Sequence, residues 1–413
     1  MLAILTFVGA GLRLACAWDH NRTRPDDTSR LVGDEYGYEG LGYDLTQGYF
    51  FLWPGRVPAY PAFIAVTYKV MGARSPASVL YAQAMFGSLA VPLAFFLARR
   101  FMRTNVAPLF AAGIVALDPA LIFQVRWLYS EAVFTPLLLL TTIALCAAAS
   151  PGGVIRSGLS GVALAILNLT RATGGLMPGL LLVAVPRKWT INKRLASAWI
   201  CGLAMAACIA PWTWHNYKTY DRFLPLASST AVLWQGCPEY YNLVRSKSYQ
   251  RVWQEELNPK WNGGHDPFSI DGDRYFTRRA IDSIKAEPKT YAKYCAKKAA
   301  YFWVGNPLSE FSYLQMMDRE QVRQLPLYDW IGKMIARNLP FVGLIACLVL
   351  LVRGRLMKFA VPLAVIAYFW AVHTVTATEI RFSEPLHPLL AVLIAGAFSR
   401  FPTRDGNADP RLD

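Results

Sequence analysis

The sequence predicts an all-α polytopic membrane protein, and three observations support this prediction. The chain has 413 residues, of which 54% are hydrophobic and only 17% charged, whereas an ordinary soluble domain has roughly 25% charged residues. Apolar residues come in blocks of about 15 to 25, the length that crosses about 30 Å of hydrocarbon as a helix. The basic residues behind the net charge of +15 lie between these blocks, which the positive-inside rule explains without nucleic acid.

The apolar blocks fit ten crossings when the short loops rich in arginine and lysine are placed in the cytoplasm. The first block lacks a basic n-region and is interrupted by Arg13, so we expect an uncleaved transmembrane helix and not a signal peptide. Both termini then lie in the cytoplasm. The expected helices are residues 2–18, 79–98, 105–122, 132–150, 158–172, 174–186, 195–212, 335–352, 359–373 and 385–399.

This threading divides the chain into three parts. Residues 1–212 form an N-terminal transmembrane module, 213–334 an extracytoplasmic helical region, and 335–413 the C-terminal transmembrane helices with a short cytoplasmic tail. The first outer loop, residues 19–78, mixes aromatic residues with prolines, which favours short helices lying in the membrane interface.

The extracytoplasmic region has its own helical signal. Apolar residues recur at helical spacing from Phe276 to Ile284, and Pro288 is expected to kink or divide the helix. Cys237 and Cys295 are the two cysteines outside the apolar blocks. Spacing alone does not decide whether they pair.

An acidic pair follows the first apolar block in the stretch GDEYGYEGLGYDL, residues 33–45. Asp34 and Glu35 have two interpretations: loop acids or a helix N-cap, or a general base that takes a proton from an acceptor hydroxyl. Nearly all acidic residues lie in the outer segments. An outward-facing catalytic site is therefore expected, with Asp34 and Glu35 as its catalytic residues.

Three arginines near the outer face, Arg381, Arg171 and Arg56, are candidates for binding a phosphate. A guanidinium group is a planar fork that binds phosphate at two points, although each arginine alone also fits a structural ion pair or a headgroup contact. Further candidates for the acceptor site or cavity are Glu131, Tyr38, Glu379 and His387.

No cofactor is expected. His373 and His387 are separated and lack a cluster of cysteines or carboxylates, so a metal site is not supported. The glycines at 37, 40 and 42 do not form a G-x-G-x-x-G motif, and no P-loop lysine is present, which argues against nucleotide binding.

Seven segments, in order over nearly the whole chain, resemble integral-membrane glycosyltransferases of the GT-C fold, which include protein O-mannosyltransferases and lipid A aminoarabinose transferases. Each motif is short and loose. Phe382 stands where these enzymes have a tyrosine, and the polar region is shorter than in some of them. The segments are GDEYGYEG, WPGRVPAYPAF, LDPALIFQVRWLYSEAVF, LNLTRATGGLMPGLLL, PWTWHNYKTYDRFLPLASST, EPKTYAKYCAKKAAYFW and EIRFSEPLHPLLAVL.

The resemblance implies an inverting glycosyltransferase that moves a sugar from a polyprenyl-phosphate donor to an acceptor hydroxyl at the outer face. In this interpretation Asp34 is the base, with Glu35 beside it, and Arg381, Arg171 and Arg56 bind the donor phosphate. The implied partners are the donor lipid and an envelope glycan, lipid or protein acceptor, with no nucleic acid. The expected location is a bacterial inner membrane.

Two alternatives remain open at this stage. A transporter or flippase for polyprenyl-linked lipids would also need a basic cavity and about ten helices, but no inverted repeat is evident in the sequence. An O-antigen ligase-like enzyme would use arginine and histidine in place of an acidic base, and the pair Asp34–Glu35 argues against it.

Overall fold

The computed structural model describes residues 1–22, 24–50, 53–150, 153, 155–184, 189–228, 231–247, 249–260, 262–305 and 327–399. Within these ranges the regular elements are all helical, as predicted. The α-helices are α1 (Leu2–Asn21), α2 (Asp34–Thr46), α3 (Ala59–Met71), α4 (Pro76–Ser88), α5 (Ala90–Arg99), α6 (Val106–Leu117), α7 (Pro119–Phe123), α8 (Glu131–Ala148), α9 (Arg156–Thr170), α10 (Leu180–Val183), α11 (Ile191–Tyr220), α12 (Pro238–Lys247), α13 (Tyr249–Val252), α14 (Ile270–Ala286), α15 (Pro288–Val304), α17 (Leu327–Val352), α18 (Ala360–Val375) and α19 (His387–Phe398).

Six helices of the described chain are long and apolar enough to cross a membrane, and a bent pair brings the number to seven. The pair is α6 with α7, which meet at 45° where Asp118 caps α7 through a 2.9 Å bond from the Ala120 amide. The count of ten crossings stays a prediction. The six spans are Leu2–Asn21, Pro76–Arg99, Glu131–Ala148, Ile191–Tyr220, Met334–Val352 and Leu356–Val375.

The crossing expected over 174–186 is wrong as a continuous helix. In place of a helix over 174–186, the structure has the 3-10 turn Met177–Gly179 followed by the four-residue α10. Gly174 and Gly175 precede this segment, and Pro178 lies within it. Glycine and proline both disfavour a helix interior, which explains the short element.

Two predicted boundaries fall inside longer helices. α11 continues through residue 212 to Tyr220, and α17 begins at Leu327, before residue 335. Pro288 divides its helix as predicted, because α14 ends at Ala286 and α15 begins at Pro288.

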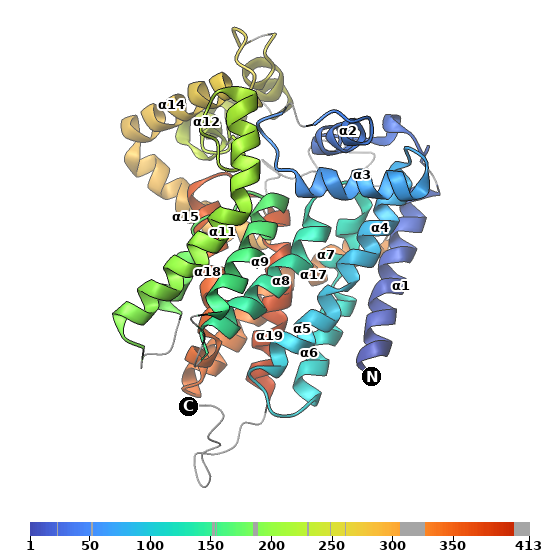
Figure 1. Cartoon of the computed structure of the whole chain (residues 1–413), viewed down its shortest axis with the longest axis vertical. Helices are drawn as coiled ribbons and strands as arrows, with labels where there is room; N and C mark the ends of the chain where they lie inside the picture. Colours follow the sequence, from blue (N-terminus) through green and yellow to red (C-terminus); the bar gives the residue numbers. More distant parts are fainter. Residues whose placement is uncertain are drawn as a thin grey trace.

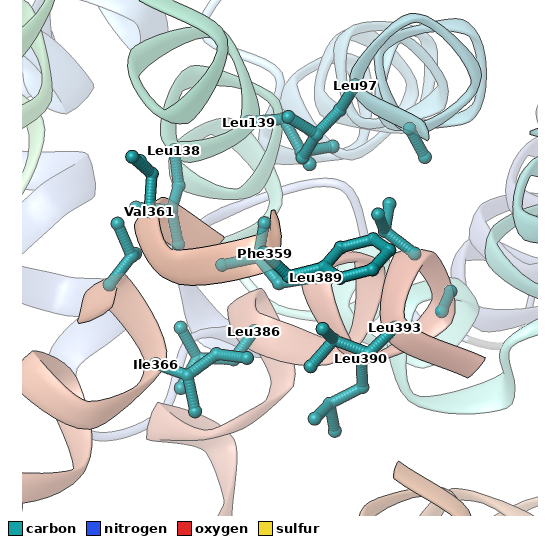
Figure 2. Packing of buried hydrophobic residues seen from close by; sticks show 14 of the residues in the cluster. Leu97, Leu138, Leu139, Phe359, Val361, Ile366, Leu386, Leu389, Leu390 and Leu393 are labelled. Carbon is teal, nitrogen blue, oxygen red and sulfur yellow. The ribbon is translucent and has the colours of Figure 1, made fainter. Parts of the chain in front are cut away.

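The main core lies where α5, α8, α18 and α19 meet. Figure 2 shows Leu97, Leu138, Leu389 and Leu393 in one packed cluster with Phe359, and all five side chains are fully buried. A Cβ atom at Gly396 would lie 2.6 Å from Phe359 Cζ, so this close packing requires glycine. Burial of these apolar side chains fixes the helices that carry the polar groups above them.

The first outer loop covers one end of the bundle with α2 and α3 (Figure 1). α2 packs tightly on α3 because Gly42 lacks a side chain, since a Cβ there would lie 2.6 Å from Ile64 Cγ2. The buried Glu39 carboxylate accepts two bonds from Arg74, at 2.7 and 2.6 Å, and one from Tyr68 at 2.9 Å. These contacts hold the helix that begins with Asp34.

The helices α12, α14 and α15 form a small layer at the same end of the molecule (Figure 1). Trp234, Tyr240, Phe276 and Ala280 are buried in its core. Cys237 and Cys295, which the sequence left open as a pair, are both free.

Candidate functional site

The site forms where the upper ends of several helices meet the first outer loop. Asp34 is the first residue of α2, after Gly33 in the left-handed region at φ 56°. Glu131 begins α8, and Arg171 follows the end of α9. Arg381 lies in η8, a 3-10 turn from Ile380 to Phe382 between α18 and α19. Segments far apart in the sequence thus converge at one place.

The Asp34 carboxylate is held between two guanidinium groups. Oδ1 accepts a bond of 2.7 Å from Arg56 Nη2, and Oδ2 accepts one of 3.1 Å from Arg381 Nη2. The Asp34 side chain remains 36% exposed, while the arginine side chains are 14% and 26% exposed. The Asp34 carboxylate is therefore bound by two arginines and also accessible to solvent.

Arg381 also connects this pair to the other acidic candidates. Its Nε donates to Glu379 Oε2 at 2.6 Å and lies 3.9 Å from Glu131 Oε1. The same Glu131 oxygen lies 2.7 Å from Arg171 Nη1. The three predicted arginines and three carboxylates consequently form one continuous cluster with balanced formal charges.

Aromatic rings frame the guanidinium groups. Arg56 lies over Tyr38 at 4.7 Å from the ring centroid, and Arg381 lies over Tyr129 at the same distance. Arg171 lies 4.5 Å from the centroid of Phe382. These cation–π contacts fix the planes of the guanidinium groups at modest energetic gain.

The cluster keeps Asp34 ionised. Partial burial alone would raise the pKa of Asp34, but the charges of Arg56 and Arg381 outweigh it and hold the pKa well below its usual range. Burial would lower the pKa of Arg381, yet Glu379, Glu131 and Asp34 raise it well above its ordinary value. Asp34 and Arg381 therefore remain charged at neutral pH.

Glu35 faces away from the cluster. Its carboxylate accepts backbone bonds from the Val32 and Leu128 amides, both at 2.8 Å, and the residue is only 3% exposed. Burial raises the pKa of Glu35, against the opposing effect of these two amides. The adjacent acids thus differ in surroundings: Asp34 binds guanidinium groups and Glu35 binds backbone.

His387 lies in a neighbouring buried network. Its Nδ1 is 2.8 Å from Asp118 Oδ2, and the adjacent Glu384 accepts a bond of 2.9 Å from Gln124. The contacts of His387 are with Asp118 and do not include Asp34.

The residues do not form an evident metal site. In the described ranges, no group of three histidine, cysteine, aspartate or glutamate residues is arranged to hold a metal ion. The two oxygens of Asp34 are taken by Arg56 and Arg381.

Tyr129 and Phe268 were not predicted as site residues. Tyr129 lies two positions before Glu131 in the segment LDPALIFQVRWLYSEAVF, so its proximity to a candidate was a usable signal. Phe268, whose ring centroid is 5.8 Å from the Arg56 guanidinium, lies more than 200 residues further along the chain. No local pattern in the sequence indicates that contact.

Comparison with solved structures decides the fold. The oligosaccharyltransferase of Archaeoglobus fulgidus in complex with zinc and sulfate matches with a TM-score of 0.54 at 17% identity, over 96% of this chain and 48% of that one. The AglB enzyme from the same organism, in complex with an inhibitory peptide and a dolichol-phosphate, matches at 0.51 with 15% identity, over 96% and 49%. The chain has the GT-C fold.

The archaeal oligosaccharyltransferase shares this fold at low sequence identity, and the similarity covers only part of its longer chain. The chain spans about half the length of the archaeal oligosaccharyltransferase. ArnT from Cupriavidus metallidurans bound to undecaprenyl phosphate matches at a TM-score of 0.43 and 13% identity, over 95% and 77% of the two chains, which is too distant to support an argument. No family model matches the chain, and no curated protein matches its sequence.

Proposed function

We propose that this protein is an inverting glycosyltransferase that moves a sugar from a polyprenyl-phosphate donor to an acceptor hydroxyl. One observation carries the proposal: an accessible Asp34 carboxylate bound between Arg56 and Arg381. This arrangement supports the proposal, because it sets a carboxylate beside guanidinium groups of the kind that bind phosphate. The glycosyltransferase fold and the dolichol-phosphate bound to the archaeal neighbour agree with it.

The donor phosphate is proposed to bind Arg381 and Arg56, with Arg171 behind them through Glu131. A phosphate oxygen competes with Asp34 for the same guanidinium forks, because carboxylate and phosphate accept the same planar pair of donors. Drawing these cations toward the phosphate weakens their hold on Asp34. The pKa of Asp34 then rises from its depressed value, and the carboxylate becomes a stronger base when the donor is present.

The proposed reaction is a displacement at the anomeric carbon of the sugar. The acceptor oxygen attacks the anomeric carbon from the face opposite the phosphate, so its configuration inverts. The bond between the anomeric carbon and the phosphate oxygen breaks, and the lipid phosphate leaves as an anion stabilised by the arginines. The acceptor proton passes to Asp34, which afterwards releases it to water. A phosphate leaving group needs no general acid.

Within this proposal Glu379 orients Arg381 and Glu131 orients Arg171, as their contacts of 2.6 and 2.7 Å support. Tyr38 supports Arg56. Glu35 takes a structural role in place of a catalytic one, and His387 steadies the start of α19. We propose that catalysis needs no metal and that the site faces the outside of a bacterial inner membrane.

Asp34→Asn tests the base. General-base catalysis contributes roughly 10²- to 10⁴-fold, so transfer from a polyprenyl-phosphate sugar to envelope acceptors should fall by that factor, while binding of the donor lipid is retained. Asp44→Asn is the matched control, because Asp44 lies on the same helix and is exposed. Undiminished transfer by Asp34→Asn would exclude this base, whereas lipid movement without any transfer by the wild type would indicate a flippase.

A further inference from the structure

A groove lies beside Phe268. It has a volume of about 390 Å³ and lies between the first outer loop, the end of α11 and the start of α14. This volume falls within the range of roughly 300–1,000 Å³ typical of small-molecule sites. The residues that line the groove include Trp53, Tyr220, Arg222, Asp266, Phe268 and Asp271.

The groove adjoins the candidate active site through a single ring. Trp53 and Phe268 stack with centroids 5.1 Å apart and planes 6° from parallel. Phe268 also contacts Arg56, whose guanidinium lies 5.8 Å from the Phe268 ring centroid. Arg56 in turn binds Asp34, so Phe268 and Arg56 connect the groove to the proposed base.

The wall is rigid at this point. A Cβ atom on Gly37 of α2 would lie 2.8 Å from Trp53 Cζ3, so the indole packs between α2 and Phe268. Pro54 is fixed as well, because its carbonyl accepts a 2.8 Å bond from the Ser228 amide. The aromatic surface is therefore in place before any ligand binds.

Charged side chains at the rim of the groove have hydrogen-bonding atoms that a ligand can reach. The Asp271 side chain is 91% exposed and lies 3.9 Å from Arg274 Nη1, and Arg222 is exposed and forms no ion pair within the described ranges. Asp266 Oδ1 accepts the Phe268 amide at 2.9 Å, which occupies one of its two oxygens. Asp221, in the left-handed region at φ 48°, ends α11 and turns the chain between Tyr220 and Arg222.

The chemistry of this lining selects against two ligand classes. The lining holds two carboxylates and one guanidinium, and Arg274 lies 3.9 Å from Asp271, so the charges at the rim balance and leave no excess positive charge for an anionic ligand. A purely apolar ligand would desolvate the rim charges without replacing their hydrogen bonds. A neutral saccharide suits the lining, because its hydroxyls donate to carboxylates and accept from arginine, while its C–H faces pack on the rings.

We propose that this groove is the acceptor subsite and binds a neutral saccharide unit of the acceptor. The inference rests on the proposed transferase activity for its meaning, but saccharide binding can be measured without transfer. The bound unit would place a hydroxyl of the acceptor past Phe268 toward Asp34.

The experiment uses the full chain in lipid nanodiscs and a panel of neutral methyl glycosides, with binding measured by saturation-transfer NMR. Wild type should bind at least one of them. The double variant Arg222→Ala with Asp271→Ala should bind it roughly tenfold more weakly, the loss expected for two hydrogen bonds. The matched control is Arg278→Ala with Asp282→Ala, two exposed residues of α14, which should bind as wild type does.

The outcomes separate this inference from the proposed function. Asp34→Asn should bind the glycoside normally, and if it also retains transfer, the base assignment fails while the groove stands. Absence of glycoside binding by wild type, or equal binding by the groove variant and wild type, overturns the inference. Binding of a serine- and threonine-containing peptide in place of glycosides, sensitive to the same double variant, would overturn the saccharide assignment.

Discussion

At the scale of single residues, the behaviour of Asp34 depends on the two guanidinium groups that bind it. Arg381 is the more connected of these, because it contacts Asp34, Glu379 and Glu131 together. It also joins the Asp34 pair to the Arg171 pair, through Glu131. Its planar shape matters as much as its charge, since its Nε and Nη2 atoms bind different carboxylates.

Arg381→Lys tests the requirement for a planar fork. Lysine keeps the positive charge but replaces the fork with a single ammonium group. We expect kcat to fall by roughly 10²- to 10³-fold, the size seen when one donor to a developing anion is lost. Arg278→Lys, an exposed arginine on α14, should leave kcat unchanged. Full activity of Arg381→Lys would mean that charge alone suffices at this position.

The pH profile tests the competition between the donor phosphate and Asp34. In the free enzyme the pKa of Asp34 is held well below its usual range, so its ionised form, and the ion pairs that depend on it, persist until the pH falls through that low value. With the donor bound, the pKa should be higher. Since kcat reports the complex and kcat/KM the free enzyme, the acid limb of kcat should lie at higher pH than that of kcat/KM for the donor. Coincident limbs in steady-state kinetics would contradict the competition.

At the scale of elements, the hairpin between α18 and α19 carries Glu379 and Arg381 and needs its own anchor. Lys298 of α15 supplies it. The Lys298 side chain is fully buried, and its Nζ donates to the carbonyls of Gly236, Thr376 and Val375 at 2.8, 2.9 and 3.4 Å. The last two carbonyls end α18, where a cation is favourable to the helix dipole.

Lys298→Met should loosen this hairpin. Methionine fills a similar volume but leaves the buried carbonyls of Gly236 and Thr376 without their donor, at a cost of about 1–3 kcal/mol. We expect a lower free energy of unfolding, measured by denaturant titration, together with reduced transfer. Lys297→Met is the control, since Lys297 directly precedes Lys298 and is exposed. Equal stability of the two variants would show that Lys298 does not anchor the hairpin.

At the scale of the whole molecule, the acidic and aromatic site lies at one end of the bundle, and the turn between α5 and α6 lies at the other (Figure 1). That turn contains Arg99, Arg100 and Arg103, which the positive-inside rule assigns to the cytoplasm. The site should consequently face outward.

Cysteine labelling checks this orientation. In a chain with its seven cysteines replaced by alanine, Asp282→Cys on α14 should react with a membrane-impermeant maleimide in spheroplasts. Thr104→Cys, in the turn between α5 and α6, should react only after the membrane is opened. Both residues are exposed, so a difference in labelling reports the side of the membrane. The reverse pattern would place the site in the cytoplasm.

The sequence identified the members of the cluster better than their arrangement. Asp34, Arg56, Arg171 and Arg381 were named from their places in outer segments, and the structure brings them into one network. Asp34 and Arg381 are 347 residues apart, so no local pattern could specify their contact. The helix expected over 174–186 failed for a local reason, because its glycines and proline outweighed its apolar composition.

By itself the sequence determined the helical membrane class and the end of the bundle where acids gather. Apolar block length and the placement of basic residues directly determine how a chain inserts into the bilayer. Only the tertiary structure decided which of two adjacent acids meets the arginines. Neighbouring residues on a helix point about 100° apart, so Asp34 reaches Arg56 and Arg381 while Glu35 turns to the backbone of Val32 and Leu128.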